Sequence, residues 1–230
     1  MKLVGLLGGT SWHSSADYYR MLNEQVNQKL GKLHSADLLL RSVDFQWHHE
    51  RQQQDQWDML AREFTKNAQA LEKAGAQGIV ICANTMHLMA EDIQNQIDIP
   101  ILHIADAIAI EAKRFQTNTL GVIGTAYTME KPFYREALEQ RDIQMLVPDE
   151  SGRKEIHRVI YEELCNGKIE SSSQQTYLQL IQSLEDNGAG AVVLGCTEIG
   201  LLVQQALTPV KLIDSLKAHV DYVVDWMIAD

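Results

Sequence analysis

The chain has 230 residues, of which 45% are hydrophobic and 22% charged, and its formal net charge at pH 7 is -11. This composition is typical of a globular protein, and the apolar runs are too short to span a membrane. The acidic balance without clustered Lys or Arg argues against nucleic-acid binding. Three scattered cysteines do not make a disulfide framework or a Cys-x-x-Cys metal site, so no metal is expected. The N-terminal apolar stretch is too brief for a signal peptide, and we expect a cytoplasmic protein.

Apolar runs alternate with helical patterns along the chain, which favours α/β units with mainly parallel strands. Strands are predicted at residues 3–8, 36–43, 78–82, 101–104, 119–123, 143–146, 191–194 and 212–214. Helices are predicted at residues 14–31, 57–74, 86–97, 105–115, 131–140, 153–166, 172–187, 197–207 and 214–229. The polar segment that holds His48, His49 and Glu50 is expected to be an exposed loop, with a lid as the alternative.

An internal repeat runs through this pattern. Residues 74–85 align without a gap on residues 187–198, and each segment is a short apolar strand that ends in small polar residues where a helix can begin. The glycine-containing strands at residues 3–9 and 119–125 also resemble each other. The repeat indicates that the chain consists of two similar halves.

The fold class predicted from the repeat is α/β, with two pseudo-symmetric lobes and the active site in the cleft between them. Each lobe is expected to be a mainly parallel sheet flanked by helices. The second lobe starts near Pro100 and the last helix follows Pro209. We therefore assign residues 1–100 plus 209–230 to an N-terminal lobe and residues 101–208 to a C-terminal lobe.

Four of the predicted strands end in small polar residues. In open parallel sheets, ligands bind beyond the carboxyl ends of the strands, where N–H groups at helix starts point at anions. Two lobes set face to face would then enclose a small carboxylate, whereas ordinary turn and cap chemistry is the alternative for each loop by itself. The candidate substrate-binding residues are Thr10, Ser11, Asn84, Thr85, Thr125, Thr128, Thr197 and Glu198.

Cys196 is the candidate catalytic residue, because it lies at the start of a predicted helix whose dipole would lower the pKa of the thiol. The repeat places it opposite Ala83, so one half offers a thiol and the other a methyl group. Cys82, one residue before the matching position, and Cys165 are expected to be structural. His87, one turn after Ala83, could face the cleft or serve as a cap or packing residue.

Five sequence blocks together resemble a known family, the cofactor-independent aspartate/glutamate racemases, and most closely the bacterial enzymes that act on L-aspartate and L-glutamate. The blocks are Gly-Gly-Thr-Ser-Trp at 8–12, Ser-Val-Asp-Phe at 42–45, Asn-Thr-Met-His at 84–87, His-Ile-Ala-Asp at 103–106 and Gly-Cys-Thr-Glu-Ile-Gly-Leu-Leu at 195–202. The resemblance implies a two-lobed homodimer that holds an acidic amino acid between its lobes and uses no pyridoxal phosphate or other cofactor. It also implies two cysteines, of which one removes the α-proton and the other protonates the opposite face.

The resemblance assigns the C-terminal catalytic cysteine to Cys196 and the position of its partner, just before Asn-Thr, to Ala83. The chain departs from the family here, because alanine has no exchangeable proton. A racemase-like isomerase with one-directional or weak activity is therefore expected. Cys82, or a water held by Thr85 or His87, is the alternative proton donor.

Two other functions stay open at this point. A single-thiol decarboxylase of malonate-type acids would need only Cys196, and a catalytically silent amino-acid-binding homologue would need neither thiol. In each case the ligand is a small amino acid or dicarboxylate. A distal carboxylate requires a cation, for which Arg41, Arg51 and Lys131 are the candidates.

Overall fold

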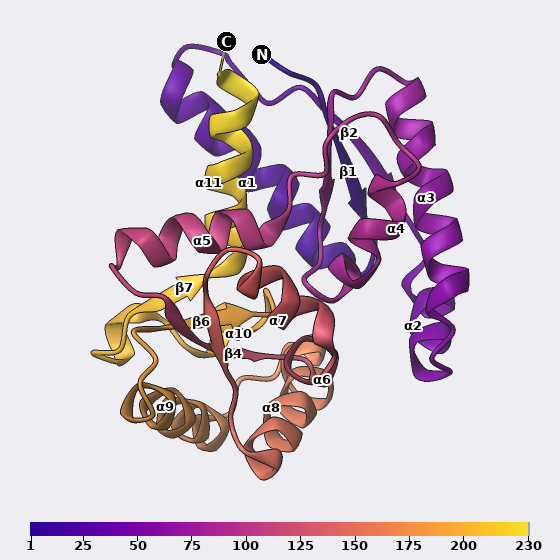
Figure 1. The fold of residues 1–230 in the computed structure, drawn as a ribbon. Helices are drawn as coiled ribbons and strands as arrows, with labels where there is room; N and C mark the ends of the chain where they lie inside the picture. The colour runs from indigo at the N-terminus through magenta and orange to yellow at the C-terminus, as the bar shows by residue number, and fades with distance from the viewer. Residues whose placement is uncertain (230) are drawn as a thin grey trace. The chain divides into compact units, whose positions relative to one another are not determined.

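The computed structural model describes residues 1–229, which form two compact units (Figure 1). Unit 1 comprises Met1–Ile104 together with the C-terminal segment from His219 onward, and unit 2 comprises Ala105–Ala218. The predicted boundary at residue 208 is therefore wrong by ten residues. Residues 209–218 belong to unit 2 because they contain its edge strand, which pairs with the strand of the second repeat.

Unit 1 is built on a three-stranded parallel sheet in the order β2-β1-β3. Its elements are β1 (Val4–Gly8), α1 (Trp12–Leu30), β2 (Leu38–Ser42), α2 (Phe45–Gln53), α3 (Trp57–Lys73), β3 (Gly78–Ile81), the 3₁₀-helix η1 (Thr85–Met89), α4 (Ala90–Gln94) and most of α11 (Ser215–Ile228). The strand predicted at 101–104 is reduced to one parallel bridge between Ile79 and Ile101, because helix α5 begins at Ile104.

Unit 2 is built on a four-stranded parallel sheet in the order β5-β4-β6-β7. Its elements are α5 (Ile104–Arg114), β4 (Thr119–Gly124), α6 (Ala126–Glu130), α7 (Pro132–Glu139), β5 (Gln144–Leu146), α8 (Glu150–Glu162), η2 (Leu164–Asn166), α9 (Ser171–Asp186), β6 (Ala191–Gly195), α10 (Ile199–Leu202), η3 (Gln205–Leu207) and β7 (Leu212–Asp214).

The two sheets repeat one another, which confirms the predicted α/β class and the internal repeat. In each sheet the glycine-containing strand, β1 or β4, lies in the interior beside the strand of the Gly-Ala repeat, β3 or β6. The bridge at Ile101 stands beside β3 as β7 stands beside β6. Because neighbouring strands are parallel, the carboxyl ends of β1 and β3 lie at the same edge of their sheet, and those of β4 and β6 at the same edge of theirs.

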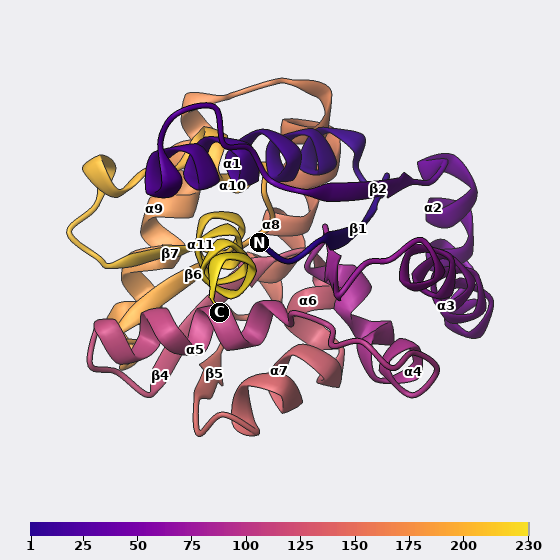
Figure 2. The same cartoon turned by 90° about the horizontal axis from the view of Figure 1, so that it is seen from above.

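The segment predicted as an exposed loop at residues 48–50 is instead part of helix α2. Its amide-rich sequence lacks the apolar periodicity of a helix, but the helix buries His48 and Gln52, which are one turn apart. The His48 ring packs edge-on against Phe64 of α3, at 5.5 Å between ring centroids. Tertiary contact with α3, beside which α2 lies in Figure 2, thus stabilises a helix that its own sequence does not predict.

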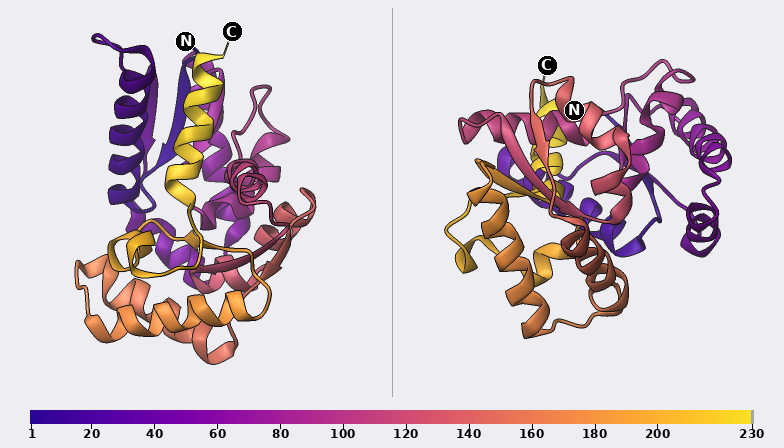
Figure 3. Two further views of the ribbon diagram at one scale, coloured as in Figure 1. Left: turned by 90° about the vertical axis from the view of Figure 1, so that its left-hand side faces the viewer. Right: turned by 60° about the horizontal axis from the view of Figure 1, so that its bottom comes forward.

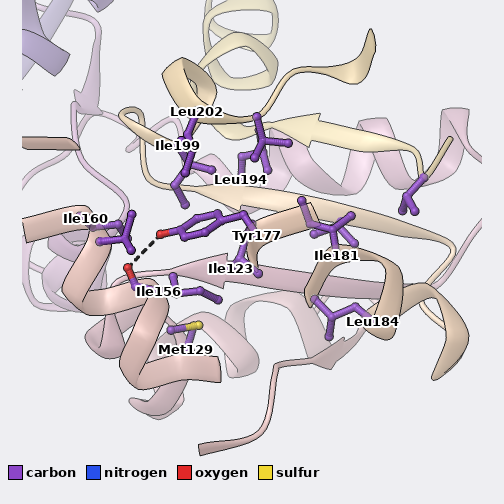
Figure 4. Close-up of a cluster of buried hydrophobic side chains, with 14 of the residues drawn as sticks. Ile123, Met129, Ile156, Ile160, Tyr177, Ile181, Leu184, Leu194, Ile199 and Leu202 are labelled. Carbon is purple, nitrogen blue, oxygen red and sulfur yellow. Dashed lines mark hydrogen bonds between the residues drawn. The ribbon is translucent and has the colours of Figure 1, made fainter. Parts of the chain in front are cut away.

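Each unit buries its own apolar core. In unit 2, Tyr177 of α9 packs among side chains of β4, α8 and α10, and its hydroxyl donates to the Ile156 carbonyl at 2.9 Å (Figure 4). In unit 1, the C-terminal helix α11 lies alongside α1 (Figure 3), where Tyr18 and His219 share a buried hydrogen bond of 2.7 Å. No helix within residues 1–229 has the length and apolar content needed to cross a bilayer.

Candidate active site

The first set of candidate residues lies at the carboxyl ends of β1 and β3 in unit 1. Two serines on the first turn of α1 fix these strand ends. Ser15 Oγ accepts the Gly9 N–H at 2.8 Å, and Ser14 Oγ donates to the Cys82 carbonyl at 2.8 Å. Gly9 has φ of 100°, and a Cβ there would lie 2.2 Å from the Val43 nitrogen. Only glycine fits this turn, so its backbone conformation is fixed by the sequence.

Four predicted binding residues, Thr10, Ser11, Asn84 and Thr85, line these two strand ends. Thr10 and Asn84 are buried, whereas Ser11 and Thr85 are partly exposed. Ala83 is also partly exposed and lies directly after the buried Cys82. The predicted binding residues of unit 1 therefore lie at the same strand ends as Ala83, the residue that the repeat aligns with Cys196.

Cys82 and His87, the neighbours of Ala83 named as alternative groups for proton transfer, are both buried. Cys82 is 1% exposed, and burial raises the pKa of its thiol far above the ordinary value. The His87 ring is also buried, with Nδ1 3.0 Å from the Ala83 carbonyl and Nε2 accepting the Ile104 N–H at 3.3 Å. A carbonyl can only accept, so Nδ1 carries the proton and both ring nitrogens are engaged with backbone.

The protonation state of His87 agrees with this packing role. Burial lowers its pKa well below the ordinary value of 6.5, and the neighbouring rings of His103 and His219 lower it further. The centroids of those rings lie 4.6 and 5.8 Å away. His87 is therefore a neutral histidine that joins the β3 strand end to the start of α5.

The second set of candidate residues lies at the carboxyl ends of β4 and β6 in unit 2. Thr125 is the N-cap of α6, where its Oγ1 accepts the Thr128 N–H at 3.4 Å and lies 3.3 Å from the Thr128 hydroxyl. Both threonines are buried. A Cβ on Gly124 would lie 3.1 Å from the Gly195 carbonyl, so the two strand ends approach closely.

Cys196, Thr197 and Glu198 follow β6 directly. The Cys196 Sγ and the Thr197 hydroxyl both donate to the same Glu198 oxygen, Oε2, at 2.9 and 2.8 Å. All three residues are partly exposed, and Cys196 packs against the apolar core of unit 2. The carboxylate thus fixes the direction of the thiol S–H bond and is itself fixed by the threonine.

The predicted effect of a helix dipole on Cys196 is wrong. The helix predicted at 197–207 is replaced by α10, which begins at Ile199 and has four residues, followed by the separate η3. Burial raises the pKa of the Cys196 thiol well above its ordinary value, and the adjacent Glu198 carboxylate raises it further. The thiol is therefore protonated at neutral pH in the ligand-free protein.

Residues of α8 and η2 complete this environment: the sequence did not single out His157 and Tyr161, whereas it predicted Cys165 to be structural. His157 Nδ1 accepts the Ala126 N–H at 3.1 Å, and its ring lies 4.7 Å from that of Tyr161. Burial and the Glu198 carboxylate raise the pKa of Cys165 to about 11. These residues are distant from the strand ends in sequence, so only the tertiary structure brings them to the site.

The three candidate cations have different surroundings. Arg41 donates from Nε to Asn67 at 3.1 Å, and Arg51 stacks on Trp47 with 3.9 Å from Cζ to the ring centroid. Lys131 lies at the end of α6, three residues beyond Thr128, and so belongs to the strand-end segment of unit 2. Within residues 1–229 no group of three or more His, Cys, Asp and Glu side chains is placed to hold a metal ion.

Comparisons with known proteins identify the class to which this arrangement belongs. Two parallel sheets that repeat one strand order, flanked by helices, form the α/β fold of the Asp/Glu racemase structures. The Asp/Glu/Hydantoin racemase family matches residues 7–223, and the chain belongs to that family.

Individual relatives extend over nearly the whole chain. The broad specificity amino-acid racemase RacX of Bacillus subtilis is 21% identical over 223 residues, which is 93% of this chain and 92% of RacX. A solved structure from Yersinia pestis, assigned as an Asp/Glu racemase, is 42% identical with a TM-score of 0.95, and all of both chains is covered. An aspartate racemase homologue from Pyrococcus horikoshii OT3 is 30% identical with a TM-score of 0.87, again with complete coverage.

Proposed function

We propose that the protein is an amino-acid racemase-type isomerase that acts on aspartate or glutamate and transfers the α-proton through Cys196 alone. The supporting observation is the contact between the Cys196 thiol and the Glu198 carboxylate at the end of β6, opposite in the repeat to an alanine. Relatives of this chain are described as a broad specificity amino-acid racemase and as an aspartate racemase homologue. No pyridoxal phosphate is required by this proposal, because the thiol itself exchanges the proton.

The proposed proton path starts from the thiol as the structure has it. When the Cys196 thiol loses its proton to solvent, the thiolate removes the proton from the substrate α-carbon, and the hydrogen bond to Glu198 orients the thiol that results. The same thiol then returns a proton to the face from which it was taken. Since the thiol proton exchanges with solvent, the substrate exchanges its α-hydrogen with retention of configuration.

Inversion needs a second acid on the opposite face, and the candidate residues of unit 1 do not supply one. Ala83 carries no proton, Cys82 is buried, and both nitrogens of His87 are engaged with backbone. Protonation of that face then falls to water. We therefore propose that inversion is much slower than exchange, since a positioned acid contributes about 10²- to 10⁴-fold to a proton transfer.

Substrate binding is assigned to the strand-end residues. The hydroxyl and amide groups of these residues suit the carboxylates and the ammonium group of an amino acid. Lys131 is proposed for the distal carboxylate, because it lies at the end of α6, three residues beyond Thr128 in the strand-end segment of unit 2. The proposed binding residues are Thr10, Ser11, Asn84, Thr85, Thr125, Thr128 and Thr197.

One observation supports a second candidate function, a single-thiol decarboxylase of malonate-type acids. A thiol whose pKa is raised by burial is protonated at rest and can deliver a proton to an enediolate left by loss of carbon dioxide. This reaction needs one thiol and no partner at position 83. Release of carbon dioxide from a disubstituted malonate, dependent on Cys196, would favour it over the racemase proposal.

The deciding experiment measures α-proton exchange in D₂O with L- and D-aspartate and with L- and D-glutamate. Proton NMR follows loss of the α-signal, and chiral chromatography follows inversion in the same samples. We expect exchange of at least one enantiomer to be much faster than inversion and to vanish in Cys196→Ser. Saturable binding of aspartate or glutamate without exchange would refute the racemase proposal and indicate a silent amino-acid-binding protein.

A further inference from the structure

A cavity of about 270 Å³ lies in unit 1, on the flank of the sheet that faces α2 and α3. Arg41 is paired in register with Leu7, whose side chain belongs to the core under α3, so the cavity opens on that face of β2. None of the strand-end residues assigned to the substrate lines it. The lining residues are Arg41, Val43, Asp44, Trp47, His48 and Glu63.

His48, which lines this cavity, carries a buried and unused hydrogen-bond acceptor. The residue is 3% exposed, and its Nδ1 lies 2.8 Å from the Asp44 carbonyl. Since that carbonyl accepts, Nδ1 carries the proton and Nε2 presents a lone pair, which has no partner among residues 1–229. Buried polar atoms in native proteins are normally hydrogen-bonded, so the atom lacks a donor that the chain does not provide.

The Arg41 guanidinium contributes a positively charged hydrogen-bond donor that the chain does not use. Its Nε donates to Asn67 at 3.1 Å and its Nη1 to the Ser42 carbonyl at 2.8 Å, whereas Nη2 has no hydrogen-bond partner within the described chain. The two contacts hold the guanidinium in place. A guanidinium fixed in this way with a free N–H is suited to a carboxylate.

The charges around the cavity select the ligand. Asp44 and Glu63 attract a cation and Arg41 attracts an anion, so a molecule with both charges is complementary to all three. His48 Nε2 additionally requires an N–H or O–H donor. A protonated amine supplies it, and Val43 and Trp47 provide apolar surface for a short side chain.

We propose that this cavity binds a small α-amino acid as its zwitterion, separately from the site around Cys196. The ligand carboxylate meets Arg41, and the ammonium group meets the two carboxylates and His48 Nε2. That nitrogen has no solvent-accessible surface in the ligand-free protein, so the proposed contact requires a side-chain movement that exposes it. The cavity makes the protein able to sense a neutral amino acid as well as to act on an acidic one.

The test uses the full-length protein and L-alanine as the probe. Imidazole nitrogens are labelled with ¹⁵N, and the probe is titrated while the His48 Nε2 resonance and the bound stoichiometry are followed. We expect one alanine per chain, an upfield shift of the Nε2 resonance as it accepts a hydrogen bond, and at least a tenfold loss of affinity in Arg41→Met. Arg62→Met, an exposed arginine of α3 outside the cavity, is the matched control and should bind as the wild type does.

Two further measurements keep the proposal open to refutation. Glycine betaine has the same charges as alanine but no N–H donor, and it should bind at least tenfold more weakly. Glu63→Gln tests the ammonium contact without removing a buried ring. The proposal is overturned if alanine does not bind saturably up to its solubility limit, if binding survives Arg41→Met, or if it leaves the His48 resonance unmoved.

Discussion

Restoring the missing thiol is the most direct test of the mechanism. In Ala83→Cys, a sulfur is placed at the position that the repeat matches to Cys196. Ala83 packs against the core of unit 1 but is partly exposed, and a single added atom is a small change in volume. We expect the variant to convert exchange with retention into two-way racemisation, because the second face of the α-carbon gains an acid.

The expected gain in the rate of inversion follows from the absence of an acid at position 83 in the native chain. Burial removes Cys82 and backbone contacts remove His87 as donors, so the full contribution of a positioned acid is missing at this strand end. That contribution is about 10²- to 10⁴-fold. At about 1.4 kcal/mol per tenfold, it corresponds to about 3–5 kcal/mol of activation free energy for inversion.

The assay is the ratio of inversion to deuterium exchange for each enantiomer. The ratio cancels differences in the amount of active protein, and a thiol titration confirms that the three native cysteines have become four. Ala83→Ser controls for the added volume, because a hydroxyl is a much weaker acid than a thiol. A folded Ala83→Cys protein with an unchanged ratio would refute the idea that the empty position limits inversion.

Three other perturbations have defined outcomes. Glu198→Gln should lower the pKa of Cys196, because the carboxylate charge and its hydrogen bond both raise it, and iodoacetamide should alkylate the thiol faster at neutral pH. Gly9→Ala should destabilise unit 1 by roughly 3 kcal/mol or more in urea unfolding, against about 1 kcal/mol for Gly31→Ala, whose Cβ meets nothing within 4 Å. The free energy of unfolding should fall by up to about 2 kcal/mol as pH drops from 7 to 5, because His87 stays neutral when folded but gains a proton when unfolded below pH 6.5.

Each of these outcomes has a control. Glu185→Gln on the exposed surface of α9 should leave the alkylation profile of Cys196 unchanged, and a Glu198→Gln profile that is not displaced would contradict the assigned role of the carboxylate. Equal destabilisation by the two glycine substitutions would mean that the close contact at Gly9 is not rigid. For His87→Gln, the loss of stability towards acid should be smaller than in the wild type.

Much of the fold follows from sequence periodicity. Short apolar runs that end in glycine or small polar residues predicted β1, β3, β4 and β6, because buried parallel strands need apolar side chains on both faces. The self-similarity of two segments then predicted two sheets of one design. Local propensity did not predict α2, in which contacts with α3 determine the conformation of a polar segment.

The sequence by itself determined where Cys196 lies and that Ala83 stands at the matching position, since a repeat aligns residues without coordinates. The protonation states were decided only by the tertiary structure. A pKa depends on burial and on groups distant in the chain, so the raised pKa of Cys196 and the neutral ring of His87 have no local signature. For the same reason the unpartnered nitrogen of His48 became visible only once α2 had packed against α3.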